Sequence, residues 1–178
     1  DIWRDGKKES VTVTLSRPLE GDWLIPNDQY DVLPSYFVYG GLVFCPLTKN
    51  LLKSWGGTWY DAAPEELVSM LGFNFLTDER DEVVLLLRVL PAEPNQGYQD
   101  FNNWIVTEVN GEKVRSLKHL AELVEKNTAE PFIRFANKNG QQIVLTPARV
   151  AAQQATILKN YRIPEDRSRD LKPAPAAP

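Results

Sequence analysis

The sequence has little of the residue types that most enzymes and metal sites require. Its 178 residues include one cysteine, Cys45, and one histidine, His119. One cysteine excludes an internal disulfide, and one cysteine with one histidine cannot supply the four ligands of a structural zinc site. A Gly-x-Ser-x-Gly motif and a phosphate-binding glycine motif are also missing. We therefore expect no catalytic residue, no metal and no cofactor.

Long runs of apolar residues and of like charges are missing too. No segment approaches 18 consecutive apolar residues, which argues against membrane insertion, and no run of five like charges occurs. With a net charge of −4, a nucleic acid is not favoured as a partner. The first residue is Asp1 rather than Met, so we expect a fragment or a processed product, and the missing signal peptide leaves the compartment open.

The sequence does contain one long apolar and aromatic stretch, Tyr30 to Thr48, which carries no charge after Asp31. Gly40 and Gly41 interrupt this stretch before the strand-like run that starts at Leu42. Because glycine adopts positive φ at little cost, the pair predicts a loop of free backbone N–H groups that leads into a strand. The alternative is a simple bend or bulge with no ligand. Peptide-binding PDZ modules use such a loop and strand to receive an extended tail.

Turn and periodicity signals divide the first half of the chain. Asp5-Gly6 predicts a hairpin within Asp1 to Leu15, whose second strand alternates Val11, Val13 and Leu15 with threonines. Arg17 to Gln29 contains Pro18 and Pro26 and is expected to be a connecting loop. In Lys49 to Arg80 we expect a helical insertion, with one short helix over Asn50 to Trp55 and another, PEELVSMLGF, beginning at Pro64.

The second half of the chain has clearer signals. Glu82 to Leu90 predicts a strand buried on both faces, and Trp104 to Val109 a second strand before an Asn110-Gly111 turn. Ser116 is expected to cap a helix that runs to Asn127 and carries one apolar face, formed by Leu117, Leu120, Ala121 and Val124. We also expect a hairpin of Phe132 to Phe135 and Gln142 to Leu145 across Asn139-Gly140, a helix over Ala148 to Tyr161, and a disordered Pro/Ala-rich end from Leu171 to Pro178.

These elements predict an α+β, mainly β, fold: a small, partly open β-barrel or sandwich covered by at least two helices. From Val83 to Glu125 the order of elements resembles the second half of a PDZ domain of the Do-like (HtrA/Deg) serine proteases. LPSYFVYGGLVFCPLT resembles the start of the second PDZ domain of the long, plant-like members. ILKNYRIPEDRSRDL is similar to the end of the same members. Asp1 to Leu15 is similar to the last hairpin of the preceding PDZ domain.

The resemblance implies a division of the chain and a location. Residues 1–16 would end a preceding PDZ domain, residues 17–166 would form a PDZ-like domain with an insertion at about 49–80, and residues 167–178 would be a flexible tail. The resemblance places the protein first in a bacterial periplasm, with a plant organelle or the nucleus as the alternative. The His-Asp-Ser triad of these proteases lies in a separate upstream domain, so we expect no protease activity from this chain.

The resemblance also assigns a peptide-binding site. Tyr39, Gly40, Gly41 and Leu42 match the carboxylate-binding loop. Val43 and Phe44 begin the matching peptide-pairing strand, which continues to Thr48, and the opposing helix presents Leu117, Leu120, Ala121 and Val124. Pro46 departs from this pattern because proline removes one donor from a strand ladder. Whether or not the glycine loop binds a ligand, we expect most of these helix residues to lie in the core.

Three functions follow. The first is a regulatory module that binds the C-terminal tails or internal segments of unfolded substrates in protein quality control. The second is an assembly module that docks on neighbouring protease subunits with its groove occluded. In that case the aromatic residues Trp55, Trp59 and Tyr60 either form an interface or cover one end of the barrel. The third, an enzyme in its own right, is opposed by the residue inventory.

Overall fold

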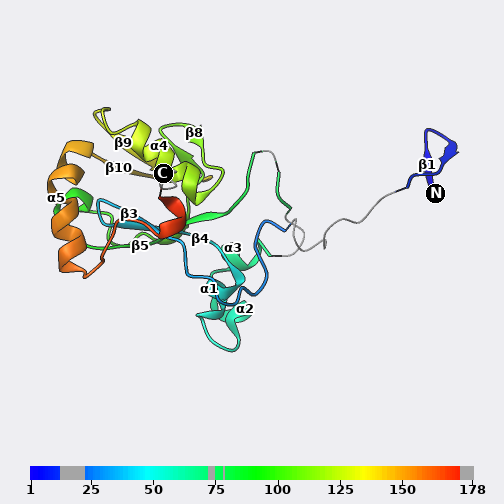
Figure 1. Ribbon diagram of the computed structural model, residues 1–178, viewed down its shortest axis with the longest axis horizontal. Helices are drawn as coiled ribbons and strands as arrows, with labels where there is room; N and C mark the ends of the chain where they lie inside the picture. Colours follow the sequence, from blue (N-terminus) through cyan, green and yellow to red (C-terminus); the bar gives the residue numbers. More distant parts are fainter. Residues whose placement is uncertain (13–22, 72–74, 78, 173–178) are drawn as a thin grey trace, which may run out of the picture.

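The computed structural model describes residues 1–12, 23–71, 75–77 and 79–172 (Figure 1). Its first two strands, β1 (Ile2–Arg4) and β2 (Lys7–Glu9), pair antiparallel across Asp5-Gly6. Both turn residues have positive φ, 51° and 74°, as the favoured two-residue hairpin requires. The predicted hairpin is confirmed up to Glu9. Val11 is exposed and lies outside a strand, and Val13 and Leu15 are outside the described residues.

A four-stranded antiparallel sheet carries the glycine pair. Its order is β3 (Phe37–Tyr39), β4 (Leu42–Pro46), β5 (Val84–Val89) and β6 (Asn102–Ile105). The predicted strand at Glu82 to Leu90 is confirmed as β5, which is paired with β4 and β6. Its near-continuous apolar sequence fits this place, because both faces of the sheet are covered.

A second antiparallel sheet has the order β10 (Gln142–Leu145), β9 (Ile133–Ala136), β7 (Glu108–Val109) and β8 (Glu112–Lys113). The single strand predicted over Trp104 to Val109 is wrong, because the chain passes from β6 in the first sheet to β7 in the second. The Asn110-Gly111 turn is confirmed, and so is the hairpin of β9 and β10.

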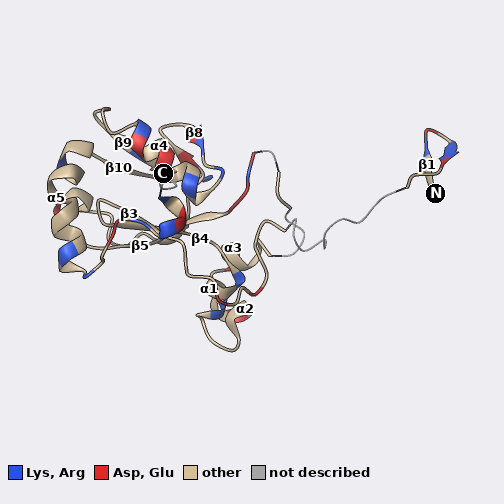
Figure 2. Cartoon of the chain, viewed as in Figure 1, with Lys and Arg blue, Asp and Glu red and all other residues tan. Residues whose placement is uncertain are grey.

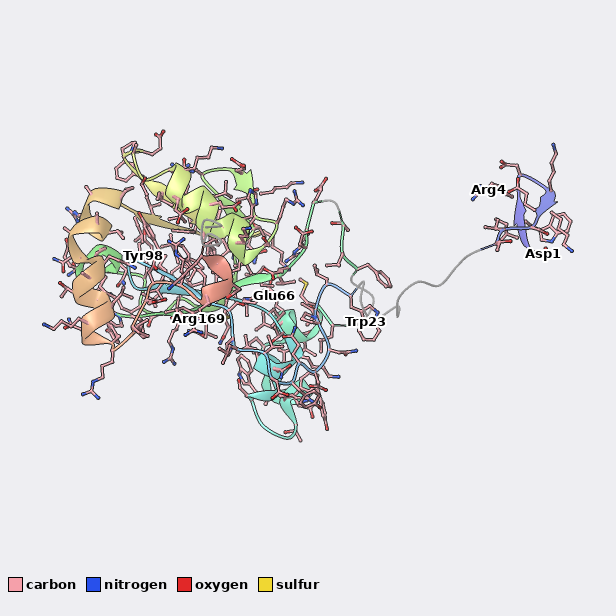
Figure 3. All side chains as sticks on the ribbon, in the orientation of Figure 1. Asp1, Arg4, Trp23, Glu66, Tyr98 and Arg169 are labelled. Atoms are coloured by element: carbon pink, nitrogen blue, oxygen red, sulfur yellow. The ribbon has the colours of Figure 1, made fainter. Side chains whose placement is uncertain are left out.

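Two helices cover the sheets. In α4 (Leu117–Lys126) the Ser116 hydroxyl accepts a hydrogen bond from the His119 N–H, as expected of an N-cap. The helix α5 (Pro147–Asn160) begins with proline at its first turn and buries Val150 and Ile157. Side chains fill the space between these helices and the sheets (Figure 3). The main core therefore lies between α4, α5 and the inner faces of both sheets.

The helical insertion forms a second core on the opposite face of the first sheet. It contains α1 (Lys49–Lys53), α2 (Trp59–Ala62), which was not predicted, and α3 (Glu65–Val68), which is shorter than predicted. Residues 23–29 form the expected irregular connection, but Leu24 and Ile25 are buried against this core instead of forming a solvated loop. Helices as short as those of the insertion are not stable alone and depend on tertiary packing. The apolar side chains of Leu24 and Ile25 supply part of that packing.

The end of the chain is also packed, up to residue 172. A short 3₁₀ turn, η3 (Arg169–Leu171), places Leu171 in the main core at 9% exposure. The flexible tail expected from residue 167 is therefore wrong for residues 167–171. Residues 173–178 lie outside the described part of the chain.

Candidate functional site

The glycine pair is the turn of a tight hairpin. Gly40 and Gly41 have φ values of 57° and 85° and join β3 to β4, with Tyr39 opposite Leu42. On its other edge, β4 pairs with β5 along its whole length. The position that an added peptide strand would take beside β4 is consequently held by the chain's own β3.

The backbone groups of this turn have partners inside the domain. The N–H of Gly40 donates to Oε1 of Gln154 at 2.9 Å, and its carbonyl oxygen accepts from Nδ2 of Asn95 at 2.7 Å. The expectation of a loop of free N–H groups is thus wrong at Gly40. Asn95, in the 3₁₀ turn η2 (Glu93–Asn95), is fully buried and also bonds Leu90 and Ala92. Sequence reasoning missed it, since nothing distinguishes it within a loop rich in proline and polar residues.

The opposing helix contributes core residues. Leu117, Leu120, Ala121 and Val124 of α4 are each at most 3% exposed and belong to the same cluster as Leu42 and Phe44 of β4. The structure therefore does bring together the loop, the strand and the helix that the sequence singled out. The sides that were expected to face a peptide are packed against one another.

The outer edge of β3 is covered by residues 166–168, here called the closing segment. The N–H of Val38 donates to the carbonyl oxygen of Asp166 at 2.7 Å, and the N–H of Ser168 donates to that of Tyr36 at 3.0 Å. The Tyr36 N–H in turn donates to the Ser168 hydroxyl. Arg167 lies opposite Phe37 in an antiparallel bridge. The closing segment thus pairs with β3 as a short added strand.

A cleft of about 460 Å³ adjoins this edge, and we call it the β3 cleft. Phe37 and Tyr39 line it from the strand, Val124 from α4, Val150 from α5, and Arg167 from the closing segment. The Tyr39 hydroxyl is buried and has no hydrogen-bond partner among the described residues. Burial raises the pKa of Tyr39 to about 12, because its charged form would lose hydration.

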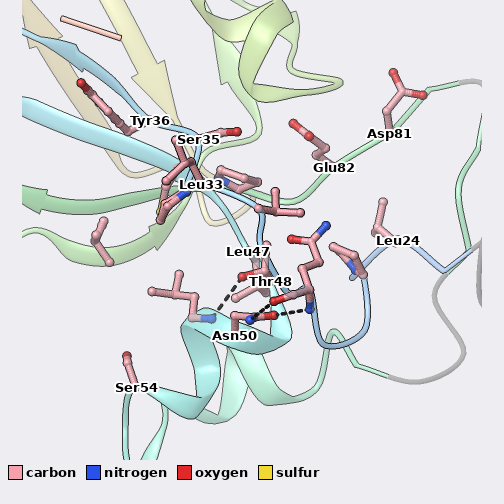
Figure 4. A pocket seen from close by; sticks show the side chains of 18 of the residues that line it. Leu24, Leu33, Ser35, Tyr36, Leu47, Thr48, Asn50, Ser54, Asp81 and Glu82 are labelled. Atoms are coloured by element: carbon pink, nitrogen blue, oxygen red, sulfur yellow. Dashed lines mark hydrogen bonds between the residues drawn. The ribbon is translucent and has the colours of Figure 1, made fainter. Parts of the chain in front are cut away.

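A second cleft, of about 600 Å³, lies between β4 and the insertion (Figure 4). Its walls include Val43 and Leu47, with Leu33 and Tyr36 from the segment before β3. Gln29 and Asn50 close one side through two reciprocal hydrogen bonds, of 2.8 and 2.9 Å. Cys45 also lines it, and burial raises the pKa of its thiol to about 12. The thiol is therefore protonated and unreactive at neutral pH.

The aromatic cluster of the insertion divides between core and surface. Trp55 and Trp59 are half-buried and pack against the second core, whereas Tyr60 is 56% exposed. The rings of Trp59 and Tyr60 meet edge to face at 5.8 Å. Both expected roles, covering the barrel and offering a contact, are thus compatible with different members of the cluster.

Charged residues of both signs are interspersed on the described part of the domain. Acidic and basic residues alternate along α4 and around β8 (Figure 2). Within residues 1–12, 23–71, 75–77 and 79–172, no group of three His, Cys, Asp or Glu side chains could hold a metal ion. Nδ1 of His119, on α4, accepts a hydrogen bond from the Arg115 N–H, and Nε2 of His119 lies 3.8 Å from Oε1 of Glu112 in β8. No helix in the same ranges is long and apolar enough to cross a membrane.

Known proteins resemble this chain closely enough to assign a family. The family described as "PDZ domain" matches residues 25–170, a range that includes the closing segment. The chain is 33% identical over 171 residues to "Protease Do-like 4, mitochondrial" of Arabidopsis thaliana, covering 96% of this chain and 29% of that protein. It is 32% identical over 178 residues to "Protease Do-like 2, chloroplastic" of the same plant, covering 96% and 27%.

A relative from another organism gives a similar result. "Serine protease DegP homolog" of Plasmodium falciparum is 34% identical over 150 residues, covering 76% of this chain and 16% of that protein. The chain therefore spans less than a third of the length of these relatives. Two of the names mention a mitochondrion or a chloroplast, and the periplasm expected first has no support among them.

Proposed function

This chain belongs to the PDZ domain family and is related to the Do-like proteases, and from this we propose that it is a protein-interaction module whose groove is filled by its own chain. It is a non-catalytic part of such a protease, because the matched region is the PDZ domain and the catalytic domain is not in this chain. The module acts in proteolysis by contacting other proteins. The proposed contacts are with neighbouring subunits of the parent protease.

The pairing of β4 on both edges is the observation that carries this proposal. A tail can add to β4 only if β3 leaves it, which would expose Phe37 and Val38, now 2% and 1% exposed. Burying an apolar side chain of this size contributes about 1.5–3 kcal/mol, so opening of this edge is strongly opposed. A native strand in the groove therefore favours assembly over open tail capture.

Strand direction gives a second argument against the binding of a peptide's C-terminal carboxylate at Gly40-Gly41. The closing segment runs antiparallel to β3, so Asp166 lies beside Val38 and Ser168 beside Tyr36. A peptide in this orientation has its N-terminal end near Gly40. Its C-terminal carboxylate would then lie at the far end of β3, away from the glycine turn.

The insertion offers the exposed surface that an assembly contact needs. Tyr60 stands on α2 at 56% exposure, and Tyr30 and Leu33, at 80% and 81%, lie on the segment before β3. Aromatic residues are enriched at the centres of protein interfaces. We place the subunit contact on the insertion, with Trp55 and Trp59 supporting Tyr60 from the core side.

Sedimentation equilibrium over a range of concentrations tests the assembly function. We expect this chain to self-associate, and Tyr60→Ala to weaken the association. Phe132→Ala is the matched control, since Phe132 is an aromatic of similar exposure, 52%, that precedes β9 of the second sheet and lies outside the insertion. A monomer at all concentrations, or equal effects of both substitutions, would count against the proposal.

Capture of substrate segments is the second candidate, and one observation favours it. Among the described residues, hydrogen bonds to the outer edge of β3 come from a three-residue segment and one glutamine side chain, which is a small cover to displace. In this candidate peptide would contact Tyr39, Gly40, Gly41, Leu42, Val43 and Phe44, together with Leu117, Leu120, Ala121 and Val124, once β3 has left β4 as well as its cover. An NMR titration with C-terminal peptides and their amides tests it: binding that requires the free carboxylate would favour tail capture.

Two smaller proposals follow from the relatives. We propose an organelle, mitochondrion or chloroplast, as the location of this protein, on the names of its Arabidopsis relatives. We also propose that the β1–β2 hairpin completes a preceding PDZ domain. In support, all residues of this hairpin are exposed.

A further inference from the structure

Arg167 occupies the β3 cleft in an unusual way for a surface arginine. Its guanidinium carbon lies 5.1 Å from the centroid of the Phe37 ring. One terminal nitrogen donates to Oε1 of Glu125 on α4 at 2.5 Å, and the other to Oδ2 of Asp166 at 2.9 Å. The side chain is only 17% exposed. Arg167 therefore bridges the strand β3 and the helix α4.

The surroundings of Arg167 are those of a recognition subsite. Guanidinium groups stack on aromatic faces and bind carboxylates, and both partners are supplied here by other elements, Phe37 by β3 and Glu125 by α4. The hydrogen bond with Asp166, followed by that with Glu125, raises the pKa of Arg167, so the side chain stays charged. Apolar side chains from β3, α4 and α5 line much of the cleft, and its other polar residues include Thr128, Glu130, Thr146 and Gln154, with the buried Tyr39 hydroxyl.

The backbone of β3 completes the subsite. The N–H and carbonyl groups of Tyr36 and Val38 point to the edge, where the closing segment and Gln154 bind them. An extended polypeptide gains affinity by such main-chain bonds, and side-chain pockets at alternate positions give selectivity. The closing segment satisfies both requirements and thus shows which ligand chemistry fits.

We propose that the β3 edge and the β3 cleft form a binding site for an arginine-bearing, extended segment of a partner protein, running antiparallel to β3. The chain's own residues 166–168 occupy this site until the partner displaces them. The inference rests on the proposed interaction function and deepens it, because it names the class of segment that is recognised. It requires no free carboxylate.

The cover is built to be displaced without unfolding the domain. The cover consists of residues 166–168, which lie directly before η3. Leu171, at the end of η3, stays anchored in the main core. A ligand that binds only the uncovered state has its apparent affinity reduced by the fraction of molecules that are uncovered. Loosening the cover must therefore tighten the binding of a peptide added in trans.

The test uses a fluorescent peptide that copies residues 163–171, acetylated and amidated, and measures its anisotropy with the whole chain. The opening variant combines Arg167→Ala with Ser168→Pro. Ser168 has φ −68°, which proline adopts, so the second change removes the N–H and the hydroxyl that bond Tyr36 without straining the backbone. Arg169→Ala is the matched control, because Arg169 is exposed on the next turn (labelled in Figure 3).

We expect the opening variant to bind the peptide at least about tenfold more tightly than the unmodified chain or Arg169→Ala. Alanine in the peptide at the position of Arg167 should weaken binding by about tenfold or more, and alanine at the position of Arg169 should not. Equal affinity for all three chains, or indifference to the peptide's first arginine, would overturn the proposal. So would dimers of the chain that exchange closing segments, because the occupant would then be a second copy.

A second measurement keeps the proposal testable if the opening variant does not fold. Excess peptide is added to the unmodified chain, and the NMR signals of the Val38 and Ser168 amides are followed. We expect Ser168 to move towards the shift of an unstructured residue while Val38 stays bonded; no change at saturating peptide overturns the proposal. Self-association through Tyr60 is measured separately, so failure of the assembly function leaves this result interpretable.

Discussion

The side-chain amide of Gln154 donates to the carbonyl oxygen of Val38 at 2.7 Å, and the same amide accepts from the N–H of Gly40 at 2.9 Å. A peptide group of an added strand would make the same two kinds of bond. Gln154 thus continues, with one side chain, the cover that the closing segment begins. It links α5 to the turn that the sequence singled out as the ligand loop.

Gln154→Ala should destabilise the domain by about 1–3 kcal/mol, because the buried Gly40 N–H and the Val38 carbonyl lose their partner. Gln153→Ala is the control: Gln153 is also half-buried on α5, and its side chain makes no hydrogen bond to the described residues. Urea unfolding followed by circular dichroism gives both values. A Gln154→Ala loss no larger than that of the control would mean that this amide does not hold the edge.

Gly41→Ala should be among the most damaging single substitutions in the domain. Gly41 has φ +85°, and an added Cβ would lie 2.3 Å from Nδ2 of Asn95 and 2.5 Å from the carbonyl oxygen of Leu90. The positive φ alone costs roughly 1–2 kcal/mol, and the contact with backbone adds to it. We expect little soluble, folded protein.

Gly57→Ala provides the comparison, since an added Cβ there meets nothing within 4 Å. Its unfolding midpoint should stay close to that of the unmodified chain. If Gly41→Ala were tolerated as well as Gly57→Ala, the turn would have to be open in solution, as a ligand loop would be.

Alkaline pH should destabilise the domain through Cys45 and Tyr39. Burial raises their pKa values from 9.0 and 10.0 to about 12 in each case. The unfolded chain therefore releases these protons before the folded chain does. The stability they contribute is complete below about pH 9 and is lost as the pH rises towards 12.

The first part of the decrease in the free energy of unfolding with pH can be assigned to the Cys45 thiol. Each group lowers the free energy of unfolding by at most about 1.4 kcal/mol per pH unit within its window. Between the unperturbed values of 9.0 and 10.0, Cys45 is the first of the two to act. Cys45→Ala should therefore flatten the decrease in that interval. Identical slopes for the two proteins, measured by urea unfolding, would contradict the assigned burial.

Local signals predicted much of the fold. Asp5-Gly6, Asn110-Gly111 and Asn139-Gly140 each mark a turn because their backbone geometry is set by the residues themselves. The helix α4 follows from its apolar period and the Ser116 cap, and β5 from a near-continuous apolar run. The strand that follows Gly40-Gly41 was predicted as well, whereas the strand β3 before it was not.

The partners of these elements could not be predicted in the same way. That residues 166–168 pair with β3 depends on contacts between segments more than a hundred residues apart, whereas β3 and β4 are neighbours along the chain. Gln154 and Asn95 are ordinary polar residues in the sequence, and only the fold places their amides against the glycine turn. The family resemblance named the loop, strand and helix of an expected groove, but it could not show that these elements pack against one another and that β3 lies beside β4.

Amide hydrogen exchange at Val38 and Gly40 measures whether the chain itself covers the β3 edge in solution. If the closing segment and Gln154 bind this edge in solution, both amides should exchange at least about a hundredfold more slowly than that of the exposed Gly57. Exchange of Val38 and Gly40 at the rate of Gly57 would contradict the account. The groove would then be open, and tail capture would become the function to pursue.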